Sequence, residues 1–271
     1  NIAKPHFGLI TNIYAAHLEC FGEIEEVAKT KSALFTSLPA EGMAFINLDD
    51  PFISKMDILC KNINFSFKYD AKYKGKWVNT DKQHLLHINE QNVGLSRSTN
   101  PIGMNALSVY SIASYLGLDH DLIARQIKSF KIPKGRGNKL LIKGITVIND
   151  SYNANLESAK SGIINLINIS GNGRKIAVIG DMLELGIKEE EYHHTLGKIL
   201  SNNAVDAVFA YGNLTQHTIR AMNGTAVFHQ FYNDKTKLIS DLKKFIKEGD
   251  HIYIKGSRGM KMEDVLIGLK I

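Results

Sequence analysis

The sequence holds few of the features that mark secreted or membrane proteins. Its only cysteines are Cys20 and Cys60, and their spacing matches no metal-binding motif. No apolar run is long enough to cross a membrane, and the start at Asn1 has no secretion-signal pattern. We therefore expect a protein without a membrane span that works in the reducing cytoplasm.

Concentrated positive charge is also missing. The net charge is +6 over 271 residues, and lysine and arginine are scattered rather than clustered. Aromatic residues do not alternate with basic ones along a stripe, as they do in many nucleic-acid-binding proteins. We therefore expect no nucleic-acid partner, and the modest positive charge fits a cleft for a phosphorylated small molecule.

Several well-known catalytic motifs are absent as well. The chain has no Gly-x-x-x-x-Gly-Lys-Ser/Thr phosphate loop, no Gly-x-Gly-x-x-Gly after a strand, no nucleophile elbow and no His-Glu-x-x-His. No single motif therefore identifies a reaction. Because the segment from His6 to Thr11 already has the pattern of a core strand, we also expect the chain to begin inside a larger protein.

What the first half does contain is the alternation of an α/β domain. The predicted elements are a strand over Phe7–Thr11, a helix over Glu23–Leu38, a strand over Met43–Asn47, a helix opened by Asp49-Asp50-Pro51, and helices over Asn105–Leu116 and Asp119–Phe130. Alternating strands and helices predict a parallel sheet with right-handed crossovers. Residues 62–95 carry short alternating runs instead, which predict a small antiparallel patch at the edge of that sheet.

The second half is predicted to be a separate, doubly wound α/β domain. Residues 131–138 break all periodicity and combine Pro133 with glycines and basic residues, as an interdomain linker does. The predicted strands beyond it are Ile145–Ile148, Lys175–Ile179, Val208–Tyr211, Ala226–Phe228 and His251–Ile254, with helical spacing after each. We therefore place one domain at residues 1–133 and another at 134–271.

Polar residues at strand ends are the candidate binding residues. The turn from Asn149 to Asn155 follows a strand and precedes a helix, where an anion can be held, although the same residue types also form a plain helix cap. Lys255 and Arg258 follow the last predicted strand, and their charges suit a carboxylate or a phosphate. Arg136 in the linker is either a phosphate or ribose contact or a solvated side chain.

Lys31 is a further candidate, because helical spacing places it on or beside the apolar face of the helix Glu23–Leu38. A lysine there either extends its ammonium group to water or is held for chemistry. The spacing alone does not decide between these two roles.

Taken together, the motifs resemble those of the Mur ligases, over the central and C-terminal domains of that family. In chain order they are Thr11-Asn12-Ile13 with Ala16-His17-Leu18-Glu19, Phe21-Gly22, Ala28-Lys29-Thr30-Lys31, Asn47-Leu48-Asp49-Asp50, Gly135-Arg136-Gly137, Asp150-Ser151-Tyr152-Asn153-Ala154-Asn155, Gly180-Asp181-Met182-Leu183-Glu184-Leu185-Gly186, and Lys255-Gly256-Ser257-Arg258 with Met262-Glu263. The resemblance implies an α/β fold, with part of a central ATP-binding domain followed by a Rossmann-like C-terminal domain.

The resemblance also implies a reaction, an ATP-dependent amide ligation in peptidoglycan precursor synthesis. The turn after Asp150 and the Met182–Gly186 stretch are similar to the branch that adds D-Ala-D-Ala to UDP-N-acetylmuramoyl-tripeptide. In that branch ATP phosphorylates the tripeptide's terminal carboxylate, and the dipeptide's amine attacks the acyl phosphate. The implied partners are these two substrates, with ATP and Mg²⁺ as cofactors. The implied enzyme is a cytoplasmic monomer.

Roles for single residues follow from the same resemblance. His17 would ligate one Mg²⁺ ion, and a carbamylated Lys31 would help to place a second. Asn105 would be one of two asparagines that hold the adenine. Arg136 and Asp150 would contact the nucleotide, with Asp150 at the ribose.

The remaining roles belong to the C-terminal half. Asn153 and Asn155 would line the same nucleotide-binding junction as Asp150. Lys255, Ser257 and Arg258 are the candidates for holding D-Ala-D-Ala.

Two departures from the family pattern bear on these expectations. Pro101 and Ile102 stand where the family has a His-Asn pair, which removes half of the usual adenine contact. The family's phosphate loop, a metal-binding glutamate and the UDP-sugar domain would lie upstream of Asn1, so we expect no turnover from this chain alone. Two alternatives stay open: another Mur-type or folylpolyglutamate-type ligase, or a non-catalytic nucleotide-binding remnant.

Overall fold

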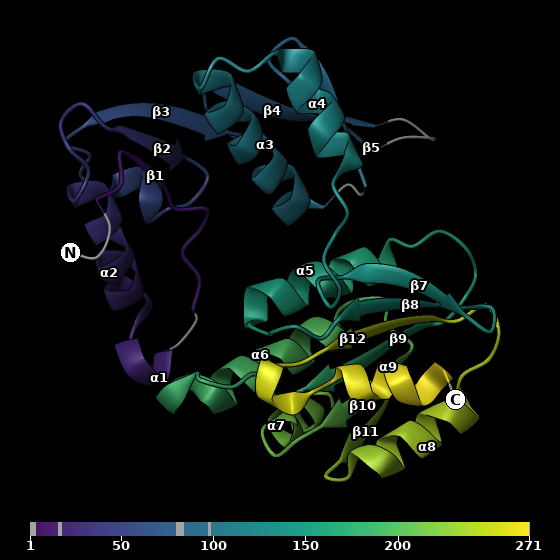
Figure 1. The fold of residues 1–271 in the computed structure, drawn as a ribbon. Helices are drawn as coiled ribbons and strands as arrows, with labels where there is room; N and C mark the ends of the chain where they lie inside the picture. The colour runs from purple at the N-terminus through teal and green to yellow at the C-terminus, as the bar shows by residue number, and fades with distance from the viewer. Residues whose placement is uncertain (1–3, 16–17, 80–83, 97–98, 271) are drawn as a thin grey trace. The chain divides into compact units, whose positions relative to one another are not determined.

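The computed structural model describes residues 4–15, 18–79, 84–96 and 99–270, which form two compact units. One unit comprises residues 1–14 and 23–131, and the other comprises 15–22 and 132–271. Figure 1 shows each unit as a sheet with helices packed against it. The assignment of residues 1–133 and 134–271 to two family domains stays a prediction.

The first unit contains a six-stranded sheet in the order β1-β2-β3-β4-β5-β6. Its strands are β1 (Phe7–Leu9), β2 (Met43–Asn47), β3 (Lys61–Ser66), β4 (Tyr73–Asn79), β5 (His84–Ile88) and β6 (Gln91–Leu95). Neighbouring strands are parallel from β1 to β4 and antiparallel from β4 to β6. The expected parallel sheet with an antiparallel patch is therefore confirmed.

One strand of that patch is assigned incorrectly from the sequence. β3 was expected among the antiparallel strands, but it pairs in parallel with β2 and continues the main sheet. Its alternation arises because Ile63 and Phe65 point into the core while Asn62 is exposed. Alternation of polar and apolar residues thus shows that one face of the strand is buried, and it carries no information about strand direction.

Helices complete the first unit. α2 (Ile24–Thr36) packs Leu34 and Phe35 close to Gly8 of β1, and Leu38, just after the helix, packs there too. α3 (Asn100–Tyr115) and α4 (His120–Ser129) contribute to a core cluster with residues of β2 to β6. Asp119 caps α4 as expected, because its Oδ1 accepts a hydrogen bond from the Leu122 amide at 2.8 Å.

The helix expected after Asp49-Asp50-Pro51 is only a single 3₁₀ turn, η1 (Ile53–Lys55). Asp50 Oδ1 accepts from the Phe52 and Ile53 amides at 3.0 Å and so holds the start of this turn. The turn ends at Met56, whose backbone is extended. The other carboxylate oxygen of Asp50 accepts from the Ile13 amide at 2.7 Å, so this residue fixes a loop as well as capping a turn.

The second unit contains a sheet in the order β11-β10-β9-β12-β8-β7. Its strands are β7 (Asn138–Ile142), β8 (Ile145–Asp150), β9 (Lys175–Gly180), β10 (Ala207–Tyr211), β11 (Phe228–Tyr232) and β12 (His251–Lys255). All neighbours are parallel except the edge strand β7, which is antiparallel to β8. The sequence pattern did not predict β7, because its two polar and three apolar residues do not alternate and all are exposed or half-buried.

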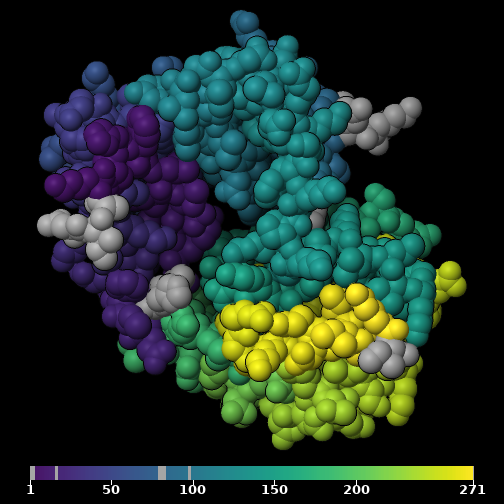
Figure 2. Space-filling model, in the orientation of Figure 1, coloured from purple at the N-terminus to yellow at the C-terminus, as the bar shows by residue number. Residues whose placement is uncertain are grey.

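Helices cover both faces of this sheet, which confirms the doubly wound prediction. One core cluster involves α5 (Leu156–Ile167), α6 (Glu189–Ser201) and α7 (Thr215–Ala221), and the other involves α8 (Lys235–Phe245) and α9 (Glu263–Lys270). The space-filling view shows α9, in yellow, across the visible face of this unit (Figure 2). None of the helices formed by the described residues is long and apolar enough to span a membrane.

A short helix, α1 (Leu18–Phe21), also belongs to the second unit. The Glu19 amide donates to the Glu184 carbonyl at 3.1 Å. Gly186, with φ of +58°, approaches the Glu19 backbone so closely that a Cβ there would lie 3.3 Å from Glu19 Cα. The Met182–Gly186 stretch thus provides the surface on which α1 packs.

Candidate functional site

The carboxyl ends of the parallel strands in the second unit bring several predicted residues together. β8 ends at Asp150 and β12 ends at Lys255, and the parallel register places these two residues directly opposite each other. Lys255 Nζ donates to Asp150 Oδ2 at 2.7 Å and to the Asn153 carbonyl at 2.9 Å. Tyr253 donates its hydroxyl to the same Asp150 oxygen at 3.0 Å. Two predicted site residues, Asp150 and Lys255, thus form one ion pair.

Burial differs sharply between the two partners. The Lys255 side chain is 3% exposed, whereas the Asp150 side chain is 22% exposed. Burial lowers the pKa of Lys255, while the neighbouring Asp150 charge opposes that shift. Within the described part of the chain, Asp150 Oδ1 makes no hydrogen bond, so this oxygen is open to a donor from a ligand.

Arg136 lies beside the same turn and is exposed. Its guanidinium group packs on the Tyr152 ring, with Cζ 3.9 Å from the ring centroid. Two backbone hydrogen bonds hold this arrangement, from the Tyr152 amide to the Gly135 carbonyl at 3.0 Å and from the Gly137 amide to the Asn149 carbonyl at 2.7 Å. Gly135 and Gly137 both have a positive φ, which glycine adopts without strain.

Asn155 is the N-cap of α5. Its Oδ1 accepts from the Ser158 amide at 2.8 Å, and Ser158 Oγ accepts from the Asn155 amide at 3.1 Å, so the two residues form a capping box. The helix-cap interpretation of this turn is therefore correct for Asn155. Asn153 is exposed, and its carbonyl is one of the two acceptors of Lys255.

The three residues predicted to hold D-Ala-D-Ala lie in different environments. Lys255 is buried, and Ser257 is buried as well, with its Oγ accepting from the Leu183 amide at 2.8 Å. Arg258 has the more exposed side chain, at 64%, although one of its nitrogens donates to Glu263 Oε1 at 2.7 Å. Of the three, Arg258 is therefore the residue that can meet a ligand without rearrangement.

Two residues that the sequence analysis did not single out hold the turn after β9. Asp181 is buried, and its Oδ1 accepts from the Leu214 and Thr215 amides at 3.1 and 2.8 Å; burial raises its pKa. His193 Nε2 accepts from the Met182 amide at 3.0 Å. Asp181 lies in a motif noted from the sequence, but His193 lies on α6 in no motif, so no sequence signal identifies it.

Lys235 is another residue without a sequence signal. It begins α8, and its ammonium group donates to the Met260 and Lys261 carbonyls at 2.8 and 3.0 Å and to Asp264 at 2.9 Å. These contacts fix the 3₁₀ turn η3 (Arg258–Met260), which carries Arg258.

In the first unit, Lys31 lies at a cavity of about 410 Å³. The cavity is lined by Leu9, Ile10, Thr11, Asn12, Thr30, Lys31 and Leu34. Lys31 is exposed, and its Nζ donates to the Asn12 carbonyl at 3.3 Å. Asn47 Nδ2 donates to the Thr11 carbonyl at 2.8 Å, so the Asn47–Asp50 motif holds one wall of this cavity.

One other predicted site residue, Asn105, lies in this unit. Asn105 is exposed on α3, one turn after Pro101 and Ile102. His17 lies outside the described residues. Among the residues that the structure does describe, no three His, Cys, Asp or Glu side chains cluster as a metal site would require.

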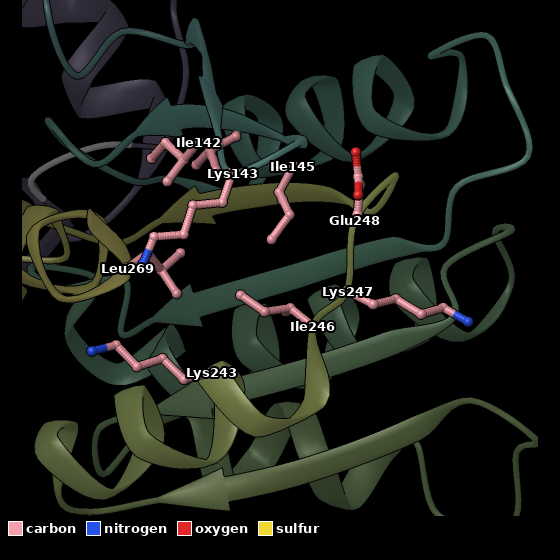
Figure 3. Close-up of a pocket in the computed structure, with 9 residues that line it drawn as sticks. Ile142, Lys143, Ile145, Lys243, Ile246, Lys247, Glu248 and Leu269 are labelled. Carbon is pink, nitrogen blue, oxygen red and sulfur yellow. The ribbon is translucent and has the colours of Figure 1, made fainter. Parts of the chain in front are cut away.

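A second cavity, of about 390 Å³, lies in the second unit near the amino end of β8, away from the carboxyl ends of the strands. It is bounded by Ile145 at the start of β8, by Ile246 directly after α8 and by Leu269 in α9. Figure 3 shows these three apolar side chains pointing into a common space while Lys247 extends away from it. None of the predicted site residues lines this cavity.

Comparison with known families gives matches to two domain models. The model described as "Mur ligase middle domain" matches residues 1–108, and that described as "Mur ligase, glutamate ligase domain" matches residues 135–258. Between them they account for most of the chain.

Curated relatives of similar sequence share one enzyme name. The UDP-N-acetylmuramoyl-tripeptide–D-alanyl-D-alanine ligase of Bacillus subtilis (strain 168) is 29% identical over 98% of this chain and 59% of its own length. The enzyme of that name from Buchnera aphidicola subsp. Baizongia pistaciae is 34% identical over 98% and 59%, and that from Escherichia coli (strain K12) is 28% identical over 100% and 61%. The chain thus spans about 60% of the length of these relatives.

Solved structures match over the same extent. The crystal structure of MurF ligase from Thermotoga maritima in complex with ADP has a TM-score of 0.86 and 26% identity, and the match covers 99% of this chain and 62% of that one. MurF from Acinetobacter baumannii has a TM-score of 0.87 at 24% identity, covering 98% and 60%, which supports the fold alone.

Proposed function

The chain belongs to the Mur ligase family, and from this premise we propose that it forms part of an ATP-dependent ligase that joins D-Ala-D-Ala to UDP-N-acetylmuramoyl-tripeptide. The enzyme name shared by the curated relatives supports this choice of substrates. The ADP bound to the Thermotoga maritima relative supports a nucleotide site. ATP and UDP-linked precursors are cytoplasmic metabolites, so the proposal places the reaction in the cytoplasm.

The observation that carries the proposal is the group of Asp150, Arg136 and Tyr152 at the carboxyl ends of the strands. Ligands of doubly wound sheets bind at this edge. Asp150 keeps one carboxylate oxygen open to a hydroxyl donor, which suits a ribose. Arg136 presents an exposed guanidinium group whose position is fixed by the Tyr152 ring, which suits a phosphate.

The proposed division of work starts with phosphoryl transfer from ATP to the tripeptide's terminal carboxylate. The dipeptide's amine then attacks the acyl phosphate, forming the amide bond and releasing phosphate. Asp150 orients the nucleotide by binding its ribose. Arg136 offsets the negative charge of the phosphoryl group while that group moves from ATP to the carboxylate oxygen. Asn105 is proposed as an adenine contact, and Arg258 as the cation for the dipeptide's carboxylate.

The residues near Lys31 can offer the oxygen ligands that a magnesium ion prefers. Lys31 has an exposed amine that carbon dioxide can reach, and a carbamate would convert it into an oxygen ligand. Thr11, Asn12 and Thr30 line the same cavity and offer further oxygens, the ligand type that Mg²⁺ prefers. We propose that a carbamylated Lys31 helps to hold one Mg²⁺ ion and that His17 ligates another, and such ions would neutralise phosphate charge.

An assay on the full-length protein that contains this chain tests the proposal. Phosphate release from ATP is measured with the tripeptide precursor and, in separate reactions, D-Ala-D-Ala, D-Glu, L-Ala or a diamino acid as the acceptor. We expect release only when the tripeptide and D-Ala-D-Ala are both present. Release with another acceptor assigns the chain to a sister ligase, and ADP binding without any release assigns it to the non-catalytic alternative.

Two variants connect that assay to the structure. Asp150→Asn and Arg136→Ala are each expected to raise the KM for ATP by about tenfold or more, since each removes a charged contact to the nucleotide. Lys237→Ala, on the exposed side of α8, is the control that should match the wild type. Unchanged KM for ATP in both site variants would contradict the proposed nucleotide site.

A further inference from the structure

Lys255 carries a buried ammonium group whose position is set by the sheet. The residue ends β12 and is 2% exposed. The parallel register with β8 places it opposite Asp150, so both side chains stand on the same face of the sheet. The contact between them therefore depends on strand pairing and not on a mobile loop.

The observed partners of this ammonium group belong to the protein. Nζ donates to Asp150 Oδ2 at 2.7 Å and to the Asn153 carbonyl at 2.9 Å. Arg136, which is exposed, lies near enough for its positive charge to act on Lys255. A substrate anion arriving from solvent therefore meets Arg136 or Arg258 and not Lys255.

The geometry at Asp150 shows what the buried lysine does. Oδ2 receives hydrogen bonds from both Lys255 and Tyr253, which limits rotation of the carboxylate. The bond to the Asn153 carbonyl ties the turn after β8 to the end of β12. With Oδ2 occupied, Oδ1 is the oxygen left for a ligand.

We propose that Lys255 is a positioning residue, which orients the Asp150 carboxylate and the Asn153 turn for the nucleotide and makes no contact with the dipeptide. This inference rests on the proposed function, since it takes Asp150 as the group that receives the ribose. It changes the role expected for Lys255 from substrate contact to support of the nucleotide contact.

A double-mutant cycle in the full-length protein tests this role. ADP affinity is measured by calorimetric titration in Lys255→Met, Asp150→Asn and the double variant. Methionine keeps the length of the lysine side chain and removes its charge. We expect Lys255→Met to weaken ADP binding about tenfold in the wild-type background, and by less than about twofold when Asp150 is already asparagine.

The dipeptide measurement separates positioning from direct contact. The KM for D-Ala-D-Ala is expected to stay within about twofold of the wild type in Lys255→Met, while the KM for ATP rises.

Controls keep the outcomes distinct. Lys237→Met removes a lysine that pairs with Asp241 on the exposed side of α8, so it should change neither constant. If Lys255→Met does not fold, Tyr253→Phe removes the other donor to Asp150 Oδ2 and should weaken ADP binding in the same direction. ADP binding needs no ligation, so a failure of the proposed reaction would still leave this test valid.

A higher KM for D-Ala-D-Ala with unchanged ADP affinity would overturn the inference and restore Lys255 as a dipeptide contact. Effects of Lys255→Met and Asp150→Asn that multiply in the double variant would also overturn it, since the two residues would then act independently.

Discussion

At the scale of single residues, burial decides what a polar side chain can contact. Lys255 is a candidate for an anion site because it is charged and follows a strand. Ser257 is a candidate because its hydroxyl can hydrogen-bond a ligand. Both are buried with protein partners in the structure. Sequence gives the residue type and the approximate strand end, but the partners depend on the register between β12 and β8, which no local pattern contains.

His193 shows the same limit and leads to a prediction about pH. It is fully buried on α6, with Nε2 accepting from the Met182 amide and Nδ1 donating to the Glu189 carbonyl at 2.7 Å. Burial lowers its pKa from the ordinary 6.5, so the folded protein holds the ring neutral. The unfolded chain takes up this proton more readily, so stability should be complete above about pH 6.5 and decline as the pH falls below it.

Calorimetric unfolding at pH 7.5 and 5.5 checks that sign. The wild type should lose more thermal stability between these values than His193→Gln, which keeps an acceptor for the Met182 amide but cannot titrate. Asp181, whose pKa is raised by burial, contributes equally to both proteins and cancels. An equal loss in the two proteins would show that His193 does not set this dependence.

Among helices and strands, a strong sequence pattern was sufficient to predict an element, and a weak pattern was not. The strands β9 and β12 were predicted almost to their ends because they are buried along their whole length and read as short apolar runs. The helix α2 was predicted almost to its ends because its apolar residues recur at helical spacing. The edge strand β7 was missed, since Leu141 is exposed and no buried face gives it a pattern. The direction of β3 was wrong because alternation reflects burial alone.

The cap of α5 supports a prediction at this scale. Asn155→Ala removes the hydrogen bond to the Ser158 amide and should destabilise the start of α5 by about 1 kcal/mol, which is about a fivefold change in an opening equilibrium. Hydrogen–deuterium exchange of a peptide over residues 156–167 should become faster by about that factor. The α8 peptide serves as the internal reference. Asn155→Asp, which can still cap, should exchange like the wild type; equal rates in Asn155→Ala would argue against the cap.

For the whole molecule, the occurrence of many family motifs in order predicted more about fold and family than any single sequence pattern did. It predicted the family, the two α/β parts and the enzyme name shared by relatives. The roles of Lys31, Asn105 and Asp150 remain predictions. The chain spans about 60% of its curated relatives, so a test of the reaction belongs to the full-length protein.

We propose that this chain belongs to a ligase that activates the tripeptide's carboxylate with ATP before the dipeptide attacks. The most direct measurement uses tripeptide precursor labelled with ¹⁸O in its terminal carboxylate, with ATP and D-Ala-D-Ala, followed by mass spectrometry of the phosphate and the peptide. The account predicts that the released phosphate carries ¹⁸O and that the peptide gains one D-Ala-D-Ala unit. Product formation with unlabelled phosphate, or labelled phosphate with a different acceptor, would contradict it.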